Sequence, residues 1–407
     1  MSPDEGAAAT DFADDGTRTR VADTGTWARV SAHAYPWDVL DDPGFVDRVQ
    51  ESGVDAVTLA MSYHSTRAAT PLHPTRRLVD ARYAALYRPV RPGIWGRLVP
   101  LTPDWCAVPD PGGEAVSILR SSGIMVNAWL VLAHNTRLGR LHPDVTVRNC
   151  FGERYPYALC PSWAEVVDHC ATLAAEALRD LPVSGVSLES CGQMGVAHLG
   201  CHEKTEGAYP PLQQRLLSIC CCPACGVDPE LVRAWFRAGA VPEGVEDAIL
   251  QVRHAATDRL RAAVLSAVRE VAPDAAVTLH GHPDPWATGP SPGLTPTASS
   301  DVDTVLVPAW ATDTQDAVAR AARMGKVAAY VTVLPPAQPA ALPDHVRRLR
   351  AAGATELALY HLGLANPETA WSPPLFTELG RAFREPMVEP SGGPWVPAKS
   401  WQVSGLT

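Results

Sequence analysis

Short apolar runs alternate with helical patterns along most of this chain. The runs are rich in Val, Ala, Leu and Thr and have the length of strands that are buried on both faces. Eight of them are found, at Ala28–Tyr35, Ala56–Tyr63, Ile124–Ala133, Val183–Glu189, Ala275–His282, Val302–Trp310, Lys326–Leu334 and Glu356–Leu362.

The segments between the runs carry helix signals, and several end at a glycine. Strand, helix and glycine repeated in this order is typical of parallel βαβ units, and eight such units close into a (β/α)8 TIM barrel of the α/β class. A doubly wound open sheet is the alternative, but eight parallel strands are many for it and no Gly-x-Gly-x-x-Gly follows the first run. The predicted helices are Asp41–Ser52, Gly113–Ser122, Ser162–Asp180, Asp313–Met324, Pro343–Ala352 and Pro374–Arg384.

Two connections are longer than a barrel needs. One follows strand two at about 63–112, and the other follows strand four at about 190–270 and includes a cysteine cluster with helices predicted at 229–238 and 245–271. Insertions of this kind lie at the carboxyl face, where barrels build their sites. The predicted organisation is a disordered acidic tail (1–25), the barrel with its Cys-rich insertion (26–386), and a Pro/Gly-rich arm (387–407).

Composition narrows the range of partners. Among 407 residues, 34 Lys and Arg stand against 44 Asp and Glu, a formal charge of -10. Nucleic-acid binding draws on clustered basic residues, so we expect none. The apolar stretches are too short to span a membrane and the acidic start lacks signal-peptide features, which predicts a cytoplasmic protein without membrane association. The sequence leaves open whether the chain forms a homo-oligomer.

Polar and aromatic side chains gather where the predicted strands end. Six of the thirteen histidines lie there. Random placement would scatter them, so a polar site at this face of the barrel is expected. The residues expected to bind substrate are His33, Tyr35, Tyr63, His64, Trp129, His280, His282, Trp310, Tyr360 and His361, and His134 lies at the same rim.

Glu189 is the strongest catalytic candidate. In Val183-Ser-Gly-Val-Ser-Leu-Glu189, strand alternation places Val186 and Leu188 on one face and Glu189 on the other, pointing into the barrel mouth. Partial burial there would raise the pKa of the carboxyl and suit it to general acid catalysis. The alternative is a structural carboxylate paired with an arginine or histidine.

The segment His280-Gly-His282-Pro-Asp284 offers a second chemistry. Two imidazoles at i and i+2 share one strand face and could hold a metal or donate hydrogen bonds to a polyol. They could equally bond loop carbonyls. Tryptophans at the rim, Trp129, Trp286 and Trp310, could stack on a sugar ring, although each could instead be a core aromatic.

The cysteines fall into two groups. Cys106, Cys150, Cys160 and Cys170 are dispersed and read as buried thiols, whereas Cys191, Cys201, Cys220, Cys221, Cys222 and Cys225 crowd one insertion. Cys220-x-Cys222-x-x-Cys225 offers three thiolates in one turn, and Cys201 or His202 would complete a structural zinc site, with Cys160 and Cys191 outside it. The alternative is a reduced, metal-free cluster. No organic cofactor is expected.

These residues resemble known barrels. Leu159-Cys-Pro-Ser-Trp163, the helix after it and the strand ending at Glu189 resemble the strand-four region of (β/α)8 glycoside hydrolases of clan A. The cysteine loop is similar to the zinc loop of β-galactosidases of glycoside hydrolase family forty-two. His202-Glu203-Lys204 before the loop resembles a looser group of glycosidase-like barrels. The likeness spans about 27–385, with its specific motifs within about 150–226.

The resemblance implies hydrolysis of a glycoside or other carbohydrate, with Glu189 as the acid/base. The sequence departs from the clan at strand seven, 327–335, which has no carboxylate, and Leu188 stands where an Asn usually precedes the acid. The remaining partners for Glu189 are Glu203, Asp284 and Asp313. Two further functions stay open: a metal-dependent hydrolase or isomerase using His280 and His282, and a sugar-binding barrel without turnover.

Overall fold

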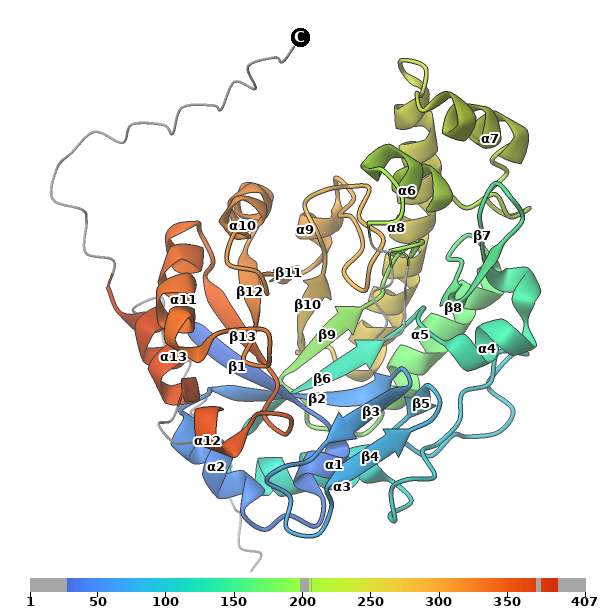
Figure 1. Cartoon of the computed structure of the whole chain (residues 1–407). Helices are drawn as coiled ribbons and strands as arrows, with labels where there is room; N and C mark the ends of the chain where they lie inside the picture. Colours follow the sequence, from blue (N-terminus) through green and yellow to red (C-terminus); the bar gives the residue numbers. More distant parts are fainter. Residues whose placement is uncertain (1–27, 198–204, 206, 371–374, 387–407) are drawn as a thin grey trace, which may run out of the picture.

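Eight parallel strands close into a barrel in the computed structural model (Figure 1). The structure describes residues 28–197, 205, 207–370 and 375–386. The first strand pairs with both the second and the last, and this pairing closes the sheet and rules out a doubly wound fold. The fold is therefore a (β/α)8 barrel, as predicted. Its strands in order are β1 (Arg29–Ala34), β2 (Ala56–Tyr63), β6 (Met125–Val131), β9 (Gly185–Glu189), β10 (Ala276–His280), β11 (Thr304–Pro308), β12 (Val327–Thr332) and β13 (Glu356–Tyr360).

The eight predicted strands are all confirmed, and no boundary differs by more than two residues. Their continuous apolar character reflects burial on both faces, because helices cover the outside of the sheet and side chains fill the inside. The surrounding helices are α2 (Phe45–Ser52), α3 (Pro111–Ser121), α5 (Ala164–Leu178), α8 (Val245–Val271), α9 (Ala298–Asp301), α10 (Gln315–Ala322), α11 (Leu342–Ala351) and α13 (Leu375–Arg384).

Among the helices that begin away from their predicted first residues, α2 and α3 do so for identifiable local reasons. Asp41 has a positive φ of 61°, so α2 begins only at Phe45. The helix α3 begins two residues earlier than predicted, because the Asp110 side chain accepts a hydrogen bond from the Gly113 N–H and Pro111 occupies the first turn.

The insertion after strand two forms the hairpin β3 (Thr66–Ala69) and β4 (Leu78–Ala81), followed by β5 (Ala85–Leu86), which pairs antiparallel with β2. The one after strand four contains α6 (Pro211–Leu217) and α7 (Pro229–Ala238). The C-terminal half of α8 packs on α5 and buries Leu260, Val264 and Val268, so it belongs to the helical layer of the barrel.

A third excursion, which the sequence did not reveal, follows strand three. It contains α4 (Thr136–Leu141), η1 (Pro143–Val145) and the hairpin β7 (Thr146–Arg148) and β8 (Arg154–Leu159). In Figure 1 this hairpin lies on the same side of the barrel as α6 and α7. Its last strand leads directly into Cys160. The remaining short helices are α1 (Pro36–Val39), η2 (Pro339–Ala341) and α12 (Pro367–Ala370).

No helix in the described ranges is both long and apolar enough to cross a bilayer. The predicted tails 1–25 and 387–407 lie outside the described residues, as do Cys201, His202 and Glu203.

Candidate active site

Glu189 ends β9 and lies at the carboxyl end of the barrel with 5% of its surface exposed. Its neighbour Leu188 joins the apolar layer between sheet and helices, so the alternation predicted from the sequence directs the carboxylate inward. Trp129 on the adjacent strand β6 donates a hydrogen bond from Nε1 to Oε2 of Glu189 at 2.8 Å. Burial raises the pKa of Glu189 to about 7, and the bond from Trp129 opposes that rise.

A neutral imidazole lies beside the carboxylate, and a second one lies behind the first. His280, at the end of β10, has Nδ1 at 3.7 Å from Oε2 of Glu189 and Nε2 at 2.9 Å from the Ser187 hydroxyl. Burial, and then the neighbouring His33, hold the pKa of His280 well below its usual value. Burial also lowers the pKa of His33 to about 3. Neither ring is a cation at neutral pH, so neither offsets the raised pKa of Glu189 with a positive charge.

Tyrosine hydroxyls surround the same point. Tyr63, Tyr330 and Tyr360 come from β2, β12 and β13, and each interacts electrostatically with Glu189. Burial is the main cause that raises the pKa of all three phenols. The Tyr35 hydroxyl lies 3.3 Å from that of Tyr360. These groups are neutral donors that can bind hydroxyl oxygens.

Trp310 differs from the other rim aromatics in its exposure. It is 48% exposed, and its ring stacks on Tyr360 at 5.3 Å between centroids with 28° between planes. Trp129, in contrast, is 1% exposed and lies edge-on to His33 and Tyr63. The site therefore has an aromatic floor and one open aromatic platform at its rim.

Several predicted residues lie around this centre without touching Glu189. His64 stacks between Tyr63 and His134, at 4.1 and 4.4 Å. His361 lies 4.2 Å from the Tyr35 ring.

The loop after β10 binds its own polar groups. Nδ1 of His282 accepts from the Asp284 N–H at 3.1 Å, and the Asp284 carboxylate accepts from the Trp286 N–H at 3.0 Å. Trp286 itself lies against Arg215 and Arg253 rather than at the rim. No contact within the described residues joins Asp284 to Glu189, and Asp313 is exposed.

Two site residues were missed from the sequence. Tyr330 occupies strand seven, which stands out in the sequence only by its lack of a carboxylate. Asp38 is 3% exposed in α1, accepts the Tyr35 N–H at 2.8 Å and lies 3.8 Å from Nδ1 of His361. Burial raises the pKa of Asp38 to about 7. Its position three residues after Tyr35 was the available signal, because the first strand ends beside it.

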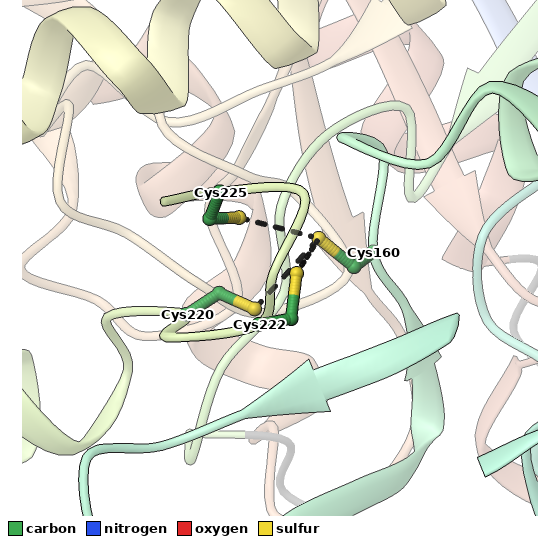
Figure 2. A group of neighbouring side chains, drawn as sticks. All are labelled: Cys160, Cys220, Cys222 and Cys225. Carbon is green, nitrogen blue, oxygen red and sulfur yellow. Dashed lines mark hydrogen bonds between the residues drawn. The ribbon is translucent and has the colours of Figure 1, made fainter. Parts of the chain in front are cut away.

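Four cysteine thiols converge beside the barrel (Figure 2). Sγ of Cys160 lies 3.5 Å from that of Cys225 and 3.7 Å from those of Cys220 and Cys222, and all four lie within 4.8 Å of one another. Cys225 is half-buried and the other three are buried. This arrangement could hold a metal ion.

The fourth position of this cluster is taken by Cys160, which the sequence placed outside it. Cys160 follows β8, so the unpredicted excursion after strand three brings it to the Cys-x-Cys-x-x-Cys turn. The predicted fourth ligands, Cys201 or His202, lie outside the described residues, and Cys191 is buried elsewhere.

Within the described part of the chain, the cysteine cluster is the one group of three or more potential metal ligands. His280 and His282 do not form such a group with Glu189 or Asp284. The geometry therefore gives no support to the metal-dependent alternative.

Known structures show the same barrel. The chain matches an α-L-fucosidase isoenzyme from Paenibacillus thiaminolyticus (TM-score 0.53, 13% identity) over 88% of this chain and 49% of that one. It matches the glycoside hydrolase domain of PgaB from Bordetella bronchiseptica (TM-score 0.53, 17% identity) over 88% and 99%. A family forty-two β-galactosidase, Gan42B from G. stearothermophilus, matches with TM-score 0.52 and 12% identity over 89% and 57%. The barrel resembles those of glycoside hydrolases.

At these identities the likeness shows the fold. The chain spans about half the length of the fucosidase and almost all of the PgaB domain. The sequence matches no protein-family model and no curated protein.

Proposed function

We propose that this protein acts on a glycoside or other carbohydrate, with Glu189 as the general acid/base. The observation that carries the proposal is the environment of Glu189, a buried carboxyl at the end of strand four with a pKa raised to about 7 and an indole donor on one oxygen. A group with this pKa holds a proton near neutral pH and can deliver it to a departing oxygen. The glycoside hydrolase barrels that share the fold support the substrate class.

Trp129 fixes which oxygen of Glu189 is available. Its N–H engages Oε2, and in the described residues no hydrogen bond reaches Oε1. The proton of the neutral acid is therefore expected on Oε1, the oxygen that would face a leaving group. Protonation of that group weakens the bond to the anomeric carbon, and the tyrosine hydroxyls of the mouth would bind sugar hydroxyls.

Trp310 supplies the remaining binding element. Its exposed ring offers an apolar face to the C–H face of a sugar, and the stacked Tyr360 supports it from behind. We also propose Asp284 and Glu203 as candidates for the second catalytic carboxylate beside Glu189. The exchanges Asp284→Asn and Glu203→Gln test them directly.

The test is a screen of the full-length protein against aryl glycosides and oligosaccharides, with Glu189→Gln as the comparison. Turnover by the wild type that Glu189→Gln loses supports the proposal. Turnover of unactivated substrate by Glu189→Gln at the wild-type rate contradicts the acid role.

One observation favours a second function, a sugar-binding barrel without turnover. Strand seven presents Tyr330 where clan A barrels, by the resemblance, carry a nucleophilic carboxylate. A barrel that only binds sugars would bind oligosaccharides, as measured by calorimetry, and would hydrolyse none of them. The same screen therefore distinguishes the two functions.

We also propose that the cysteine cluster holds a structural zinc ion. Tetrahedral zinc with Zn–S bonds of about 2.3 Å separates its sulfur ligands by about 3.8 Å. The observed Sγ separations from Cys160, 3.5 to 3.7 Å, fit that geometry. Four thiolates leave no open position for water, so the ion would stabilise the insertions and take no part in catalysis.

A further inference from the structure

Ser187, His280 and Glu189 form a connected set of side chains on two neighbouring strands. Ser187 lies two residues before Glu189 on β9, so both point into the barrel. The Ser187 hydroxyl lies 2.9 Å from Nε2 of His280, and the opposite ring nitrogen, Nδ1, lies 3.7 Å from Oε2 of Glu189. All three side chains are at least nine-tenths buried.

The charges of the site decide how the His280 proton is placed. With the proton on Nε2, the lone pair of Nδ1 would face the lone pairs of Oε2, which is repulsive in a buried site. With the proton on Nδ1, an N–H dipole points toward the carboxylate and Nε2 becomes an acceptor. The Ser187 hydroxyl can rotate to donate to that acceptor.

We infer that Ser187 is a positioning residue: its hydroxyl donates to Nε2 of His280 and holds the imidazole as the neutral tautomer that carries its proton on Nδ1, facing Glu189. This inference rests on the proposed function for its catalytic meaning, although the tautomer can be measured without turnover. Ser187 would then act on Glu189 through His280, without touching the substrate.

Other titratable side chains also lie near His280 and Glu189. His33 on β1 and Tyr330 on β12 lie 6.3 and 5.5 Å from the His280 ring, between centroids. Tyr63 and Tyr360 interact electrostatically with Glu189. All four are neutral near pH 7, so the orientation of the His280 dipole is the element of the site that Ser187 can change.

Thr278 provides a matched control. It is the register partner of Ser187 on β10 and lines the same interior cavity. In the described residues its hydroxyl makes no hydrogen bond to His280. Thr278→Val removes a hydroxyl from the same cavity as Ser187→Ala does, and a methyl group takes its place.

The experiment is two-bond ¹H–¹⁵N spectroscopy of ¹⁵N-histidine-labelled, full-length protein at pH 7.5, with His280 assigned through His280→Gln. In the wild type, Ser187→Thr and Thr278→Val, Nδ1 of His280 should be protonated and Nε2 unprotonated. Ser187→Ala should shift the population toward the Nε2–H form. With glutamate labelled with ¹³C at the carboxyl, Glu189 should then titrate at higher pH in Ser187→Ala alone, because the Nδ1–H dipole that faces the carboxylate is lost.

A wild-type His280 that carries its proton on Nε2, or on both nitrogens, overturns the inference. So does an unchanged tautomer in Ser187→Ala. Should that variant not fold, Ser187→Cys, a weaker donor, should give a mixed population, and an unmixed Nδ1–H population there overturns the inference as well. A protein with the expected tautomers but no turnover of any glycoside would contradict only the proposed function.

Discussion

Trp129 and Glu189 meet across two adjacent strands, with the indole N–H 2.8 Å from one carboxylate oxygen. The bond favours the charged carboxylate, while burial favours the neutral acid, and burial is the larger effect. The pKa of Glu189 is therefore raised, but less than burial alone would raise it. The indole would thus influence the pH range of the acid role proposed for Glu189.

Trp129→Phe should move the basic limb of the pH–activity profile upward. A hydrogen bond to a charged group is worth about 1.5 to 3 kcal/mol, so its loss should raise the pKa of Glu189 by about one to two units. A general acid works while protonated, so activity should persist to higher pH.

Trp37→Phe is the matched control for this exchange. Trp37 is as buried as Trp129, and its indole nitrogen has no hydrogen-bond partner in the described residues. Both variants remove part of a buried indole and should lower stability in denaturant titrations. Trp129→Phe should lose more, because it also loses a hydrogen bond, and only Trp129→Phe should shift the limb. If the basic limb lies at the same pH in both variants, Trp129 does not influence the pKa of Glu189.

Glu189→Gln should impair substrates according to their leaving groups. A general acid contributes about 10²- to 10⁴-fold, so alkyl glycosides and oligosaccharides should lose activity by that factor. Nitrophenyl glycosides need little protonation and should be hurt less. The measurement is kcat/KM across a series of leaving groups, and a uniform loss across the series would contradict the proton-donor role.

Glu189 should also make the protein less stable as the pH rises. Its folded pKa of about 7 lies above its ordinary 4.5, so the folded state holds a proton that the unfolded state releases. The contribution of Glu189 to the free energy of unfolding is fully present below pH 4.5 and is lost as the pH rises from 4.5 to about 7. The loss is on the order of 3 kcal/mol.

The amide introduced by Glu189→Gln does not titrate. The free energy of unfolding of this variant, relative to that of the wild type, should therefore rise between pH 5 and pH 8. Asp38→Asn should behave alike, because burial also raises the pKa of Asp38 to about 7. Urea titrations of each variant at both pH values measure the change. A pH-independent difference would mean that these carboxyls are not perturbed by folding.

The local sequence pattern predicts the barrel and the catalytic candidate Glu189. It does not predict which residues from elsewhere in the chain reach the site and the cysteine cluster. Alternating apolar residues located strand four and the direction of Glu189, because a strand's period of two is visible in the sequence. The sequence assigns Asp38 no role and places Cys160 outside the zinc site, since each reaches its site through a loop or hairpin whose path depends on tertiary packing. Three cysteines in one turn could be recognised together, but their partner arrives from 60 residues earlier in the chain.

Trp310→Ala should weaken carbohydrate binding much more than it lowers stability. Its ring is 48% exposed, so truncation should cost far less than the roughly 3 to 5 kcal/mol of a buried aromatic. Loss of stacking should weaken affinity by about two- to tenfold, from a contact of about 0.5 to 1.5 kcal/mol. Calorimetry with an oligosaccharide and a thermal melt measure both. Large destabilisation with intact affinity would make Trp310 a structural aromatic.

The purified protein should contain about one zinc per chain, and the identity of the fourth ligand can be decided by substitution. Cys160→Ser and Cys222→Ser should each lose the metal, because a serine hydroxyl is a poor replacement for a thiolate. Cys201→Ser should keep it, since the thiols of Cys160, Cys220, Cys222 and Cys225 lie close enough to supply all four proposed ligands. Cys106→Ser, at a half-buried thiol outside the cluster, controls for thiol removal itself.

Elemental analysis of protein purified without chelator reports the zinc, and the melting temperature reports its structural role. The two cluster variants should melt at lower temperature than the wild type and should no longer respond to chelator. The wild type should fall toward their melting temperature when chelator is added, because binding energy at a structural zinc site is folding energy. Zinc retained by Cys160→Ser but lost by Cys201→Ser would return the fourth position to the insertion after strand four, and a wild type without zinc would leave four reduced thiols.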